Sequence, residues 1–185
     1  MNSVEQKISF RPVTKDDLQL IHKWLQTEHV KINYSKTELT FDELRDKYLP
    51  AIHGEIPTQR FIILIDNKPI GQIQMYKLND HPEYQKMIQI NESAAGIDIF
   101  IGDTDFLHKG LGSVVIKKFL TDYVFRKLEV ESCVIGPNPK NIAAIKAYQK
   151  AGFTYLKTVF NSEDNEEEYL MRITKEATQK EELIN

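Results

Sequence analysis

Residues 105–113 read Asp-Phe-Leu-His-Lys-Gly-Leu-Gly-Ser, and the predicted fold is built around this stretch. An apolar run over 94–101 precedes it and predicts a strand, and apolar residues at helical spacing follow over 114–127. The amides that begin a helix have no partner within it, and the helix dipole adds to their attraction for anions. Because Gly110 and Gly112 lack a Cβ, a phosphate can approach the backbone closely there. The stretch is therefore predicted to bind a pyrophosphate.

The glycine spacing narrows the choice of ligand. The stretch lacks the G-x-x-x-x-G-K-[ST] pattern of a P-loop and the third glycine of a dinucleotide-binding fingerprint. We therefore do not expect the ligand to be held as ATP or NAD is held. His108 and Lys109 add side-chain donors or charge. The alternative interpretation of the two glycines is a tight turn with only a structural role.

Length and composition bound the class of protein. The 185 residues suit one domain, with residues 1–175 as the domain and 176–185 as a charged tail. The contents of 41% hydrophobic and 28% charged residues are ordinary for a globular protein. A net charge of −3 argues against broad nucleic-acid binding and suits a cationic substrate.

Cellular location and metal content are also addressed by the sequence. Cys133 is the single cysteine, so no internal disulfide forms and a reducing cytoplasm is expected. The first six residues are polar, unlike a signal peptide, and no apolar run approaches the roughly 20 residues that span a bilayer. The five histidines are scattered without the spacing of metal ligands, so no metal is expected.

The remaining pattern predicts a mixed α/β fold around one sheet. Thr14 is predicted to cap a first helix, and Thr40 with Glu43 to form the capping box of a second. Residues 28–39 and 78–90 read as irregular polar segments, and residues 175–185 as a fraying end. The predicted strands are 7–12, 60–66, 70–77, 94–101, 131–135, 153–160 and 169–173, and the later helices are 41–51, 114–127 and 141–150.

A second motif gives a resemblance to a known family. Residues 141–153 follow the pattern N-x-x-A-x-x-x-Y-x-K-x-G-F, at a suitable distance after the glycine stretch. Together the two stretches resemble the GNAT superfamily of acyl-CoA-dependent N-acetyltransferases. Within it the chain looks most like the aminoglycoside 6′-N-acetyltransferases, a likeness that includes residues 47–50 (Lys-Tyr-Leu-Pro) and 68–71 (Lys-Pro-Ile-Gly).

The resemblance implies a mixed, mostly antiparallel sheet that is splayed at its centre, flanked by helices, with acetyl-CoA in the gap. It implies that the amides of Lys109 to Ser113 bind the pyrophosphate and that the strand backbone pairs with the pantetheine. Asn141 would touch the pantetheine arm, and Tyr148 would protonate the leaving thiolate. The residues so assigned to acetyl-CoA are Ile99, Phe100, Ile101, His108, Lys109, Gly110, Leu111, Gly112, Ser113 and Asn141.

The chain departs from the family pattern at a few positions. Leu107 stands where the superfamily usually has Arg or Gln, which weakens the side-chain part of the pyrophosphate site and leaves the backbone part intact. Gly136 stands where some aminoglycoside enzymes have an acid. Their aromatic pair is also missing near Lys31 and Ile32, although Tyr34 lies nearby in the sequence. These departures leave the exact substrate open.

Asp98 is the candidate base. It interrupts an apolar strand, where Asp is a poor strand former, and alternation places it on the same face as Phe100. A carboxylate there would hold an incoming ammonium and accept its proton, directly or through water. A backbone amide near Phe100 would meet the developing oxyanion, a contact typically worth about 3 kcal/mol. The alternative is an aspartate on a solvated face of the sheet.

Tyr148 and Trp24 each have a structural alternative. Tyr148 shares a helix face with Ile145 and Ala144, so it is either the catalytic acid or a core residue with a satisfied hydroxyl. Trp24 is interpreted as core or as the wall of a cleft, with substrate contact as the functional alternative.

A polycationic substrate calls for several carboxylates. The candidates are Asp98, Glu55, Asp80 and either Glu28 or Glu38, although each alone also fits a solvated surface acid. The predicted substrate-binding set is Trp24, Tyr34, Glu55 and Asp98.

Three functions remain open from the sequence. The first is acetyl transfer to the 6′-amine of aminoglycosides, a resistance activity. The second is the same reaction on another amine, such as a peptide, a polyamine or a siderophore precursor. The third is a non-catalytic acyl-CoA-binding module, against which Asp98 and Tyr148 argue together. The expected partner is a small cationic amine, with neither nucleic acid nor membrane, and the chain is expected to be a monomer or a homodimer.

Overall fold

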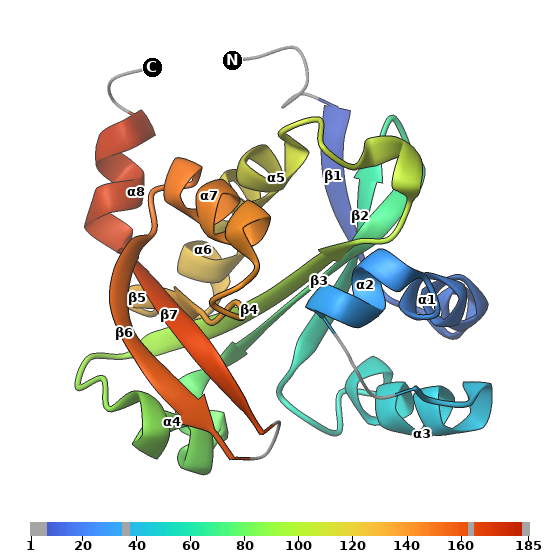
Figure 1. Cartoon of the computed structure of the whole chain (residues 1–185), viewed down its shortest axis with the longest axis horizontal. Coiled ribbons are helices and arrows are strands. Elements are labelled where there is room, and N and C mark those ends of the chain that lie inside the picture. Colours follow the sequence, from blue (N-terminus) through green and yellow to red (C-terminus); the bar gives the residue numbers. More distant parts are fainter. Residues whose placement is uncertain (1–6, 35–37, 163–164, 183–185) are drawn as a thin grey trace. The chain divides into compact units, whose positions relative to one another are not determined.

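The computed structural model describes residues 7–34, 38–162 and 165–182 (Figure 1). Seven strands form a mixed, mostly antiparallel sheet in the order β1-β2-β3-β4-β5-β7-β6, which confirms the predicted fold class. The strands are β1 (Ile8–Pro12), β2 (Gln59–Ile65), β3 (Lys68–Lys77), β4 (Ala94–Ile101), β5 (Ser132–Ile135), β6 (Thr154–Asn161) and β7 (Glu166–Thr174). The helices are α1 (Leu18–Leu25), α2 (Glu28–Asn33), α3 (Phe41–Ile52), α4 (Pro82–Ile88), α5 (Leu111–Phe119), α6 (Phe125–Lys127), α7 (Ile142–Lys150) and α8 (Lys175–Glu182).

The chain divides into two compact units. The N-terminal unit comprises Asn2–Met75 and Asp98–Lys109, and the C-terminal unit comprises Tyr76–Ile97 and Gly110–Asn185. Strand β4 therefore contributes its first half to one unit and its second half to the other, and the change falls between Ile97 and Asp98. The predicted catalytic residues follow this division, because Asp98 belongs to the N-terminal unit and Tyr148 to the C-terminal unit.

The N-terminal unit packs α1, α2 and α3 around one apolar core (Figure 1). Strands β1 and β2 pair in antiparallel register, with Ile8 opposite Ile65. The turn between β2 and β3 differs from the prediction. Asp66 and Asn67 both have positive φ (49° and 65°), which gives a tight two-residue hairpin, so β3 begins at Lys68 rather than Ile70.

Both capping predictions in this unit are confirmed, the first with a modification. The side chain of Thr40 accepts from Glu43 N at 3.3 Å, and the Glu43 carboxylate accepts from Thr40 N at 2.8 Å. Thr14 caps a short 3-10 turn over Lys15–Asp17, and α1 begins only at Leu18. Pro50 lies inside α3, within its last turn.

The segment predicted to be irregular, 28–39, begins with helix α2, so that prediction was wrong for Glu28–Asn33. Thr27 precedes the helix with extended backbone, and its hydroxyl donates to Trp24 O at 2.6 Å. The helix buries a single side chain, Val30, against the core. One buried residue in six leaves no visible helical period, which is why the sequence pattern did not reveal it.

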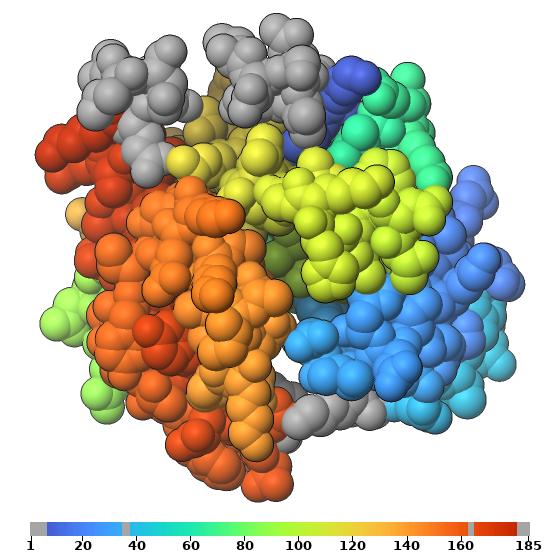
Figure 2. Space-filling model, turned by 45° about the horizontal axis from the view of Figure 1, so that its top comes forward, coloured from blue at the N-terminus to red at the C-terminus, as the bar shows by residue number. Residues whose placement is uncertain are grey.

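The C-terminal unit holds α5 and α7 side by side (Figure 1). Strands β5, β6 and β7 belong to it, with β7 antiparallel to both of the others. A separate apolar cluster in this unit includes Leu78, Ile88 and Leu170. In the space-filling view, α7 and the strands that follow it (orange to red) form a continuous surface of this unit (Figure 2).

Three local predictions for this unit require correction. Segment 78–90 contains a 3-10 turn and helix α4, which begins at Pro82 and ends before Gln89, where φ is +52°. The tail is helical as far as Glu182 rather than frayed. The long helix expected over 114–127 begins earlier, at Leu111, and passes through a π-helical segment, Leu120–Val124, before α6. None of the described helices is long and apolar enough to cross a membrane.

Candidate acetyltransferase site

The glycine stretch forms the start of helix α5, as its pattern predicted. Gly110 is the N-cap and has φ +71°, a left-handed conformation that favours glycine. A Cβ built on Gly110 would have no heavy atom within 4 Å, apart from its chain neighbours, so the space beside the helix start is open. The Ser113 hydroxyl donates to Gly110 O at 3.2 Å. The amides of the first turn of α5 therefore face a site that can accept an anion.

Gly112 has a different role in the same turn. A Cβ on Gly112 would lie 3.6 Å from the Cβ of Ala147, an ordinary contact between α5 and α7. Neither packing nor a positive φ therefore requires glycine at this position. The remaining reason for glycine at position 112 is that a ligand can approach the backbone closely there.

The residues just before the helix are also arranged around charge. His108 has φ +58°, so two residues close together, His108 and Gly110, have a left-handed backbone conformation. Asp103 accepts from Asp105 N at 2.9 Å and pairs with Lys68 at 2.8 Å, and these contacts hold its pKa below the usual value. The ammonium groups of Lys68 and Lys109 lie 5.0 Å and 5.5 Å from the Phe106 ring centroid.

Asp98 is held in place by a neighbouring strand. Gln74 Nε2, on β3, donates to Asp98 Oδ2 at 2.7 Å. The aspartate is part-buried, and Phe100, two residues further along β4, is buried at 6% exposure. Gln74 was not singled out from the sequence, because a single glutamine in a half-buried strand carries no pattern of its own.

The predicted substrate residues of the N-terminal unit occupy different environments. Trp24 is 5% exposed in the apolar core, and its ring fills the space where a Cβ on Gly102 would stand. Tyr34 lies edge-on to Phe100, with ring centroids 4.7 Å apart. Glu55 is exposed in the loop after α3, where its carboxylate lies 3.4 Å from His53 Nδ1. Tyr34 and Trp24 both pack against Phe100 on the strand of Asp98, since the ring centroids of Trp24 and Phe100 lie 6.2 Å apart. Substrate contact for each of the three residues stays a prediction.

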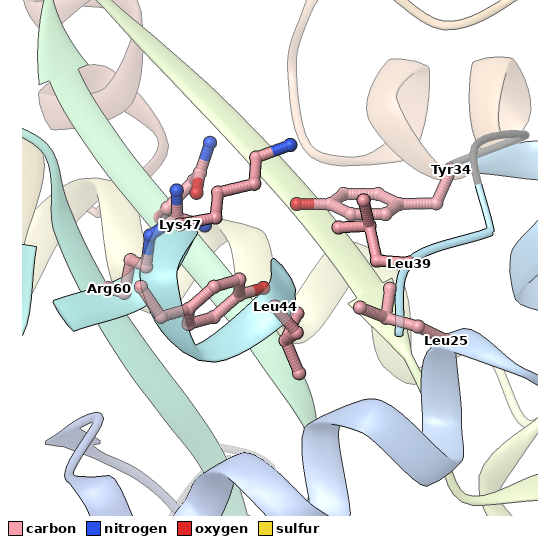
Figure 3. Close-up of a pocket in the computed structure, with 8 residues that line it drawn as sticks. Leu25, Tyr34, Leu39, Leu44, Lys47 and Arg60 are labelled. Carbon is pink, nitrogen blue, oxygen red and sulfur yellow. The ribbon is translucent and has the colours of Figure 1, made fainter. Parts of the chain in front are cut away.

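A small cavity of about 90 Å³ opens in the N-terminal unit beside Gln74 (Figure 3). One wall consists of leucines from α1, α3 and the segment before α3. Lys47 on α3, Arg60 on β2 and Tyr34 supply polar groups, and in Figure 3 the tips of Lys47 and Tyr34 point toward one another. Lys47 belongs to the family-like stretch 47–50, but no pattern in the sequence indicates a role for it or for Arg60.

Tyr148 lies on α7, which begins as predicted. Asn141 is the N-cap, and its Oδ1 accepts from Ala144 N at 3.1 Å. Gly152 follows the helix with φ +96°, as expected of its stop position. Tyr148 is 8% exposed, and its ring centroid lies 6.3 Å from that of Phe153. The structure thus orients the phenol by packing, and its catalytic role stays a prediction.

The position of Gly136 has a physical explanation. A Cβ there would lie 2.4 Å from Glu168 Oε2, so the carboxylate of Glu168 fills the space that a side chain would need. Glu168 accepts from the Tyr84 hydroxyl at 2.8 Å and from Asn161 Nδ2 at 2.7 Å. This carboxylate was not singled out from the sequence, because Glu168 lies just before the predicted strand 169–173 and no local pattern indicates what its side chain contacts.

Among the described residues, no group of three or more His, Cys, Asp or Glu is placed to hold a metal ion. Three features of the structure are those of an acyl-CoA-dependent acetyltransferase. They are the start of α5 at Gly110, the capped helix α7 that carries Tyr148, and the mixed sheet. Residues 13–160 match the acetyltransferase (GNAT) domain family, and the chain belongs to that family.

Characterised relatives refine this assignment. The chain is 27% identical over 154 residues to the aminoglycoside N(6')-acetyltransferase type 1 of Klebsiella pneumoniae, covering 82% of this chain and 76% of the relative. It superimposes with a TM-score of 0.80 and 25% identity on AAC(6')-Ib in complex with paromomycin and acetyl-CoA, over 94% of this chain and 96% of the other. A spermidine N-acetyltransferase from Vibrio cholerae, solved with coenzyme A and spermine, shares the fold at 20% identity, with a TM-score of 0.73 over 94% and 99% of the two chains. The resemblance inferred from the sequence is therefore confirmed at the level of family and enzyme class.

Proposed function

We propose that this chain transfers an acetyl group from acetyl-CoA to a primary amine, with the 6′-amine of an aminoglycoside as the first substrate to test. The observation that carries the proposal is Asp98, a part-buried carboxylate held at 2.7 Å by Gln74 Nε2 within a strand of an acetyltransferase fold. A carboxylate fixed in this way is suited to bind an ammonium group and to take its proton.

Acetyl-CoA fits the residues present at the start of α5. The open space beside Gly110 and the unpaired amides of the first turn suit a pyrophosphate. When bound, acetyl-CoA supplies a thioester whose carbonyl carbon bonds to the amine nitrogen as the carbon–sulfur bond breaks. His108, Lys109 and Asn141 are the flanking polar residues assigned to it by resemblance.

Two side chains transfer protons in the proposed reaction. Asp98 accepts the proton that the attacking amine gives up, and the Tyr148 hydroxyl gives a proton to the departing sulfur. The Phe100 amide would meet the charge that develops on the carbonyl oxygen. An ammonium loses two protons on becoming an amide while the departing sulfur gains one, so after both side chains return to their starting protonation by exchange with water, each turnover releases one proton to solvent.

A second candidate is the same reaction on an amine that is not an aminoglycoside. The position at which some aminoglycoside enzymes carry an acid is Gly136 here, and Glu168, which fills that space, is already bonded to Tyr84 and Asn161. The carboxylate is therefore engaged in holding α4 to β6 and β7.

The test is the release of thiol from acetyl-CoA in the presence of neomycin or paromomycin, which differ in an amine or a hydroxyl at the 6′ position. Cys133 is fully buried, so the wild-type chain serves with an amine-free blank. Turnover with neomycin alone would support the 6′ assignment. Turnover with both would move the acetylated amine to another position. No turnover with either compound would leave the second candidate substrate, an amine that is not an aminoglycoside.

A further inference from the structure

None of the described residues that line the cavity beside Gln74 is acidic. Leu25, Leu39 and Leu44 form its apolar side, and the backbone of Leu39 is fixed because its carbonyl lies 2.9 Å from His22 Nε2. A volume of about 90 Å³ is several times the roughly 10–15 Å³ that one water needs, so a short substituent with a polar end fits.

The opposite side of the cavity carries positive charge. Lys47 and Arg60 line it, and within the described part of the chain neither forms an ion pair with a carboxylate. The Arg60 guanidinium lies over the Tyr48 ring, 4.2 Å from its centroid, which fixes its direction. Arg60 Nε is buried, and among the described residues it has no hydrogen-bond acceptor. A buried donor without a partner is costly, so an acceptor from a ligand would be favourable here.

Gln74 connects this cavity to the candidate base. Its Nε2 donates to Asp98 Oδ2, while its Oε1 is buried and has no donor among the described residues. A substrate ammonium at Asp98 would therefore lie beside the amide of Gln74, which also lines the cavity. The rest of the same molecule would extend past Gln74 along the leucine side toward Lys47 and Arg60.

We propose that this cavity is a subsite for a carboxylate carried by the acceptor, so that the acetylated molecule is a zwitterion with an amine at one end and an anionic group at the other. The proposal rests on the proposed acetyl transfer and deepens its second candidate substrate. Charge decides the assignment, because a second ammonium in the cavity would meet Lys47 and Arg60, while none of the described lining residues is acidic and Asp98, beyond Gln74, is occupied by the first ammonium.

A binding measurement tests the cavity without requiring turnover. Hexanoate, hexanamide and hexylammonium share one alkyl chain and differ in the charge of the end group, and calorimetry with the full chain compares them. Hexanoate is expected to bind most tightly. Lys47→Gln should weaken hexanoate by about tenfold, the loss typical of removing one charged partner. Arg45→Gln removes a positive charge from the same helix outside the cavity and should leave binding unchanged.

A turnover measurement separates this proposal from the proposed function. The wild-type chain should show a lower KM for 6-aminohexanoate than for 6-aminohexanamide, and Lys47→Gln should remove the difference. Equal binding of hexanoate and hexanamide, or binding unchanged by Lys47→Gln, would overturn the carboxylate subsite even if aminoglycosides are acetylated. Tight binding of hexanoate without turnover of any amine would support the subsite and overturn the proposed reaction.

Discussion

The two units of the chain contribute different kinds of chemical group to the proposed reaction. The N-terminal unit supplies side chains, because Asp98, Gln74 and Lys47 matter through their carboxylate, amide and ammonium groups. The C-terminal unit supplies mainly backbone, through the amides that begin α5, and one packed phenol at Tyr148. A backbone site works with many sequences and can be shared by a family. A side-chain site changes with each substitution, so under the proposal we expect the coenzyme site to be the common part and the acceptor site to be the variable part.

The largest expected effect comes from Asp98→Asn in the N-terminal unit. Turnover should fall by about 10³-fold, because the base is lost while the side-chain shape and the bond to Gln74 can be kept. Coenzyme A binding should be unchanged. Steady-state kinetics and calorimetry measure the two quantities.

Asp66→Asn is the matched control, since Asp66 is an exposed aspartate in the turn between β2 and β3, outside the residues assigned to either substrate. It should leave turnover unchanged. An equal loss of turnover and coenzyme binding in Asp98→Asn would show that Asp98 has a structural role.

Tyr148→Phe tests the one side chain that the C-terminal unit is proposed to contribute to proton transfer. The ring packing against Phe153 is retained, so coenzyme A affinity and thermal stability should match the wild type. Turnover should fall by about 100-fold, the low end for a lost general acid. Tyr155→Phe, at an exposed tyrosine, controls for loss of a hydroxyl. Unchanged turnover would remove Tyr148 from the mechanism.

Gly112→Ala tests whether the backbone of α5 binds the coenzyme. The added methyl would stand 3.6 Å from Ala147 Cβ, and alanine favours a helix, so the fold should tolerate it. Coenzyme A affinity should fall by about tenfold, since a Cβ blocks close approach to the amides. Calorimetry and thermal unfolding measure the two effects.

Gly110→Ala provides the contrast, because its φ of +71° makes any Cβ cost about 1–2 kcal/mol of folding free energy. A Gly112→Ala protein with unchanged coenzyme affinity would contradict the pyrophosphate assignment.

Arg11→Gln should have the smallest effect of these substitutions. We expect it to change only the folding stability of the N-terminal unit. Arg11 binds both carboxylate oxygens of Asp17, at 2.7 Å and 2.6 Å. Burial of Asp17 opposes its ionisation, but hydrogen bonds from Arg11 and Thr14 outweigh this and hold its pKa below the usual 3.8. The guanidinium is 39% exposed, so its loss should lower the free energy of unfolding by only about 1 kcal/mol at neutral pH.

The sign of the pH dependence follows from the lowered pKa. The stability that ionised Asp17 contributes is present above its unfolded pKa of about 4 and is lost as pH falls through the lower folded value. Urea unfolding between about pH 6 and about pH 3 should therefore show a smaller acid-induced loss in Arg11→Gln than in the wild type. Parallel curves for the two proteins would contradict this origin of the acid sensitivity.

The parts of the fold that could be predicted are those with local signals. The Thr40–Glu43 capping box identified the start of α3, and Asn141 was recognised as the start of α7, whereas α5 begins three residues before its predicted start. Strand β4 was predicted with its observed bounds, because eight residues in a row are apolar except Asp98. Elements with one buried residue each, α2 and α4, were missed because no period is visible in them.

The residues of the candidate site also divide into those that could be predicted from the sequence and those that could not. Asp98 was visible because it breaks an apolar strand, whereas Gln74 and Arg60 acquire meaning only from what lies opposite them. Such contacts depend on strand register and helix packing, which no local pattern in the sequence encodes. The cavity and the Glu168 contacts therefore required the structure.

The contact between Gly136 and Glu168 also constrains how this enzyme can change. An aspartate introduced at Gly136 alone would bring a Cβ to within 2.4 Å of Glu168 Oε2 and place two carboxylates in one space. Glu168 would have to turn aside or be shortened, and either change would break its hydrogen bonds with Tyr84 and Asn161. An acid at position 136 is therefore expected to lower stability unless position 168 changes with it. Acceptor preference in this chain is expected to show epistasis between positions 136 and 168.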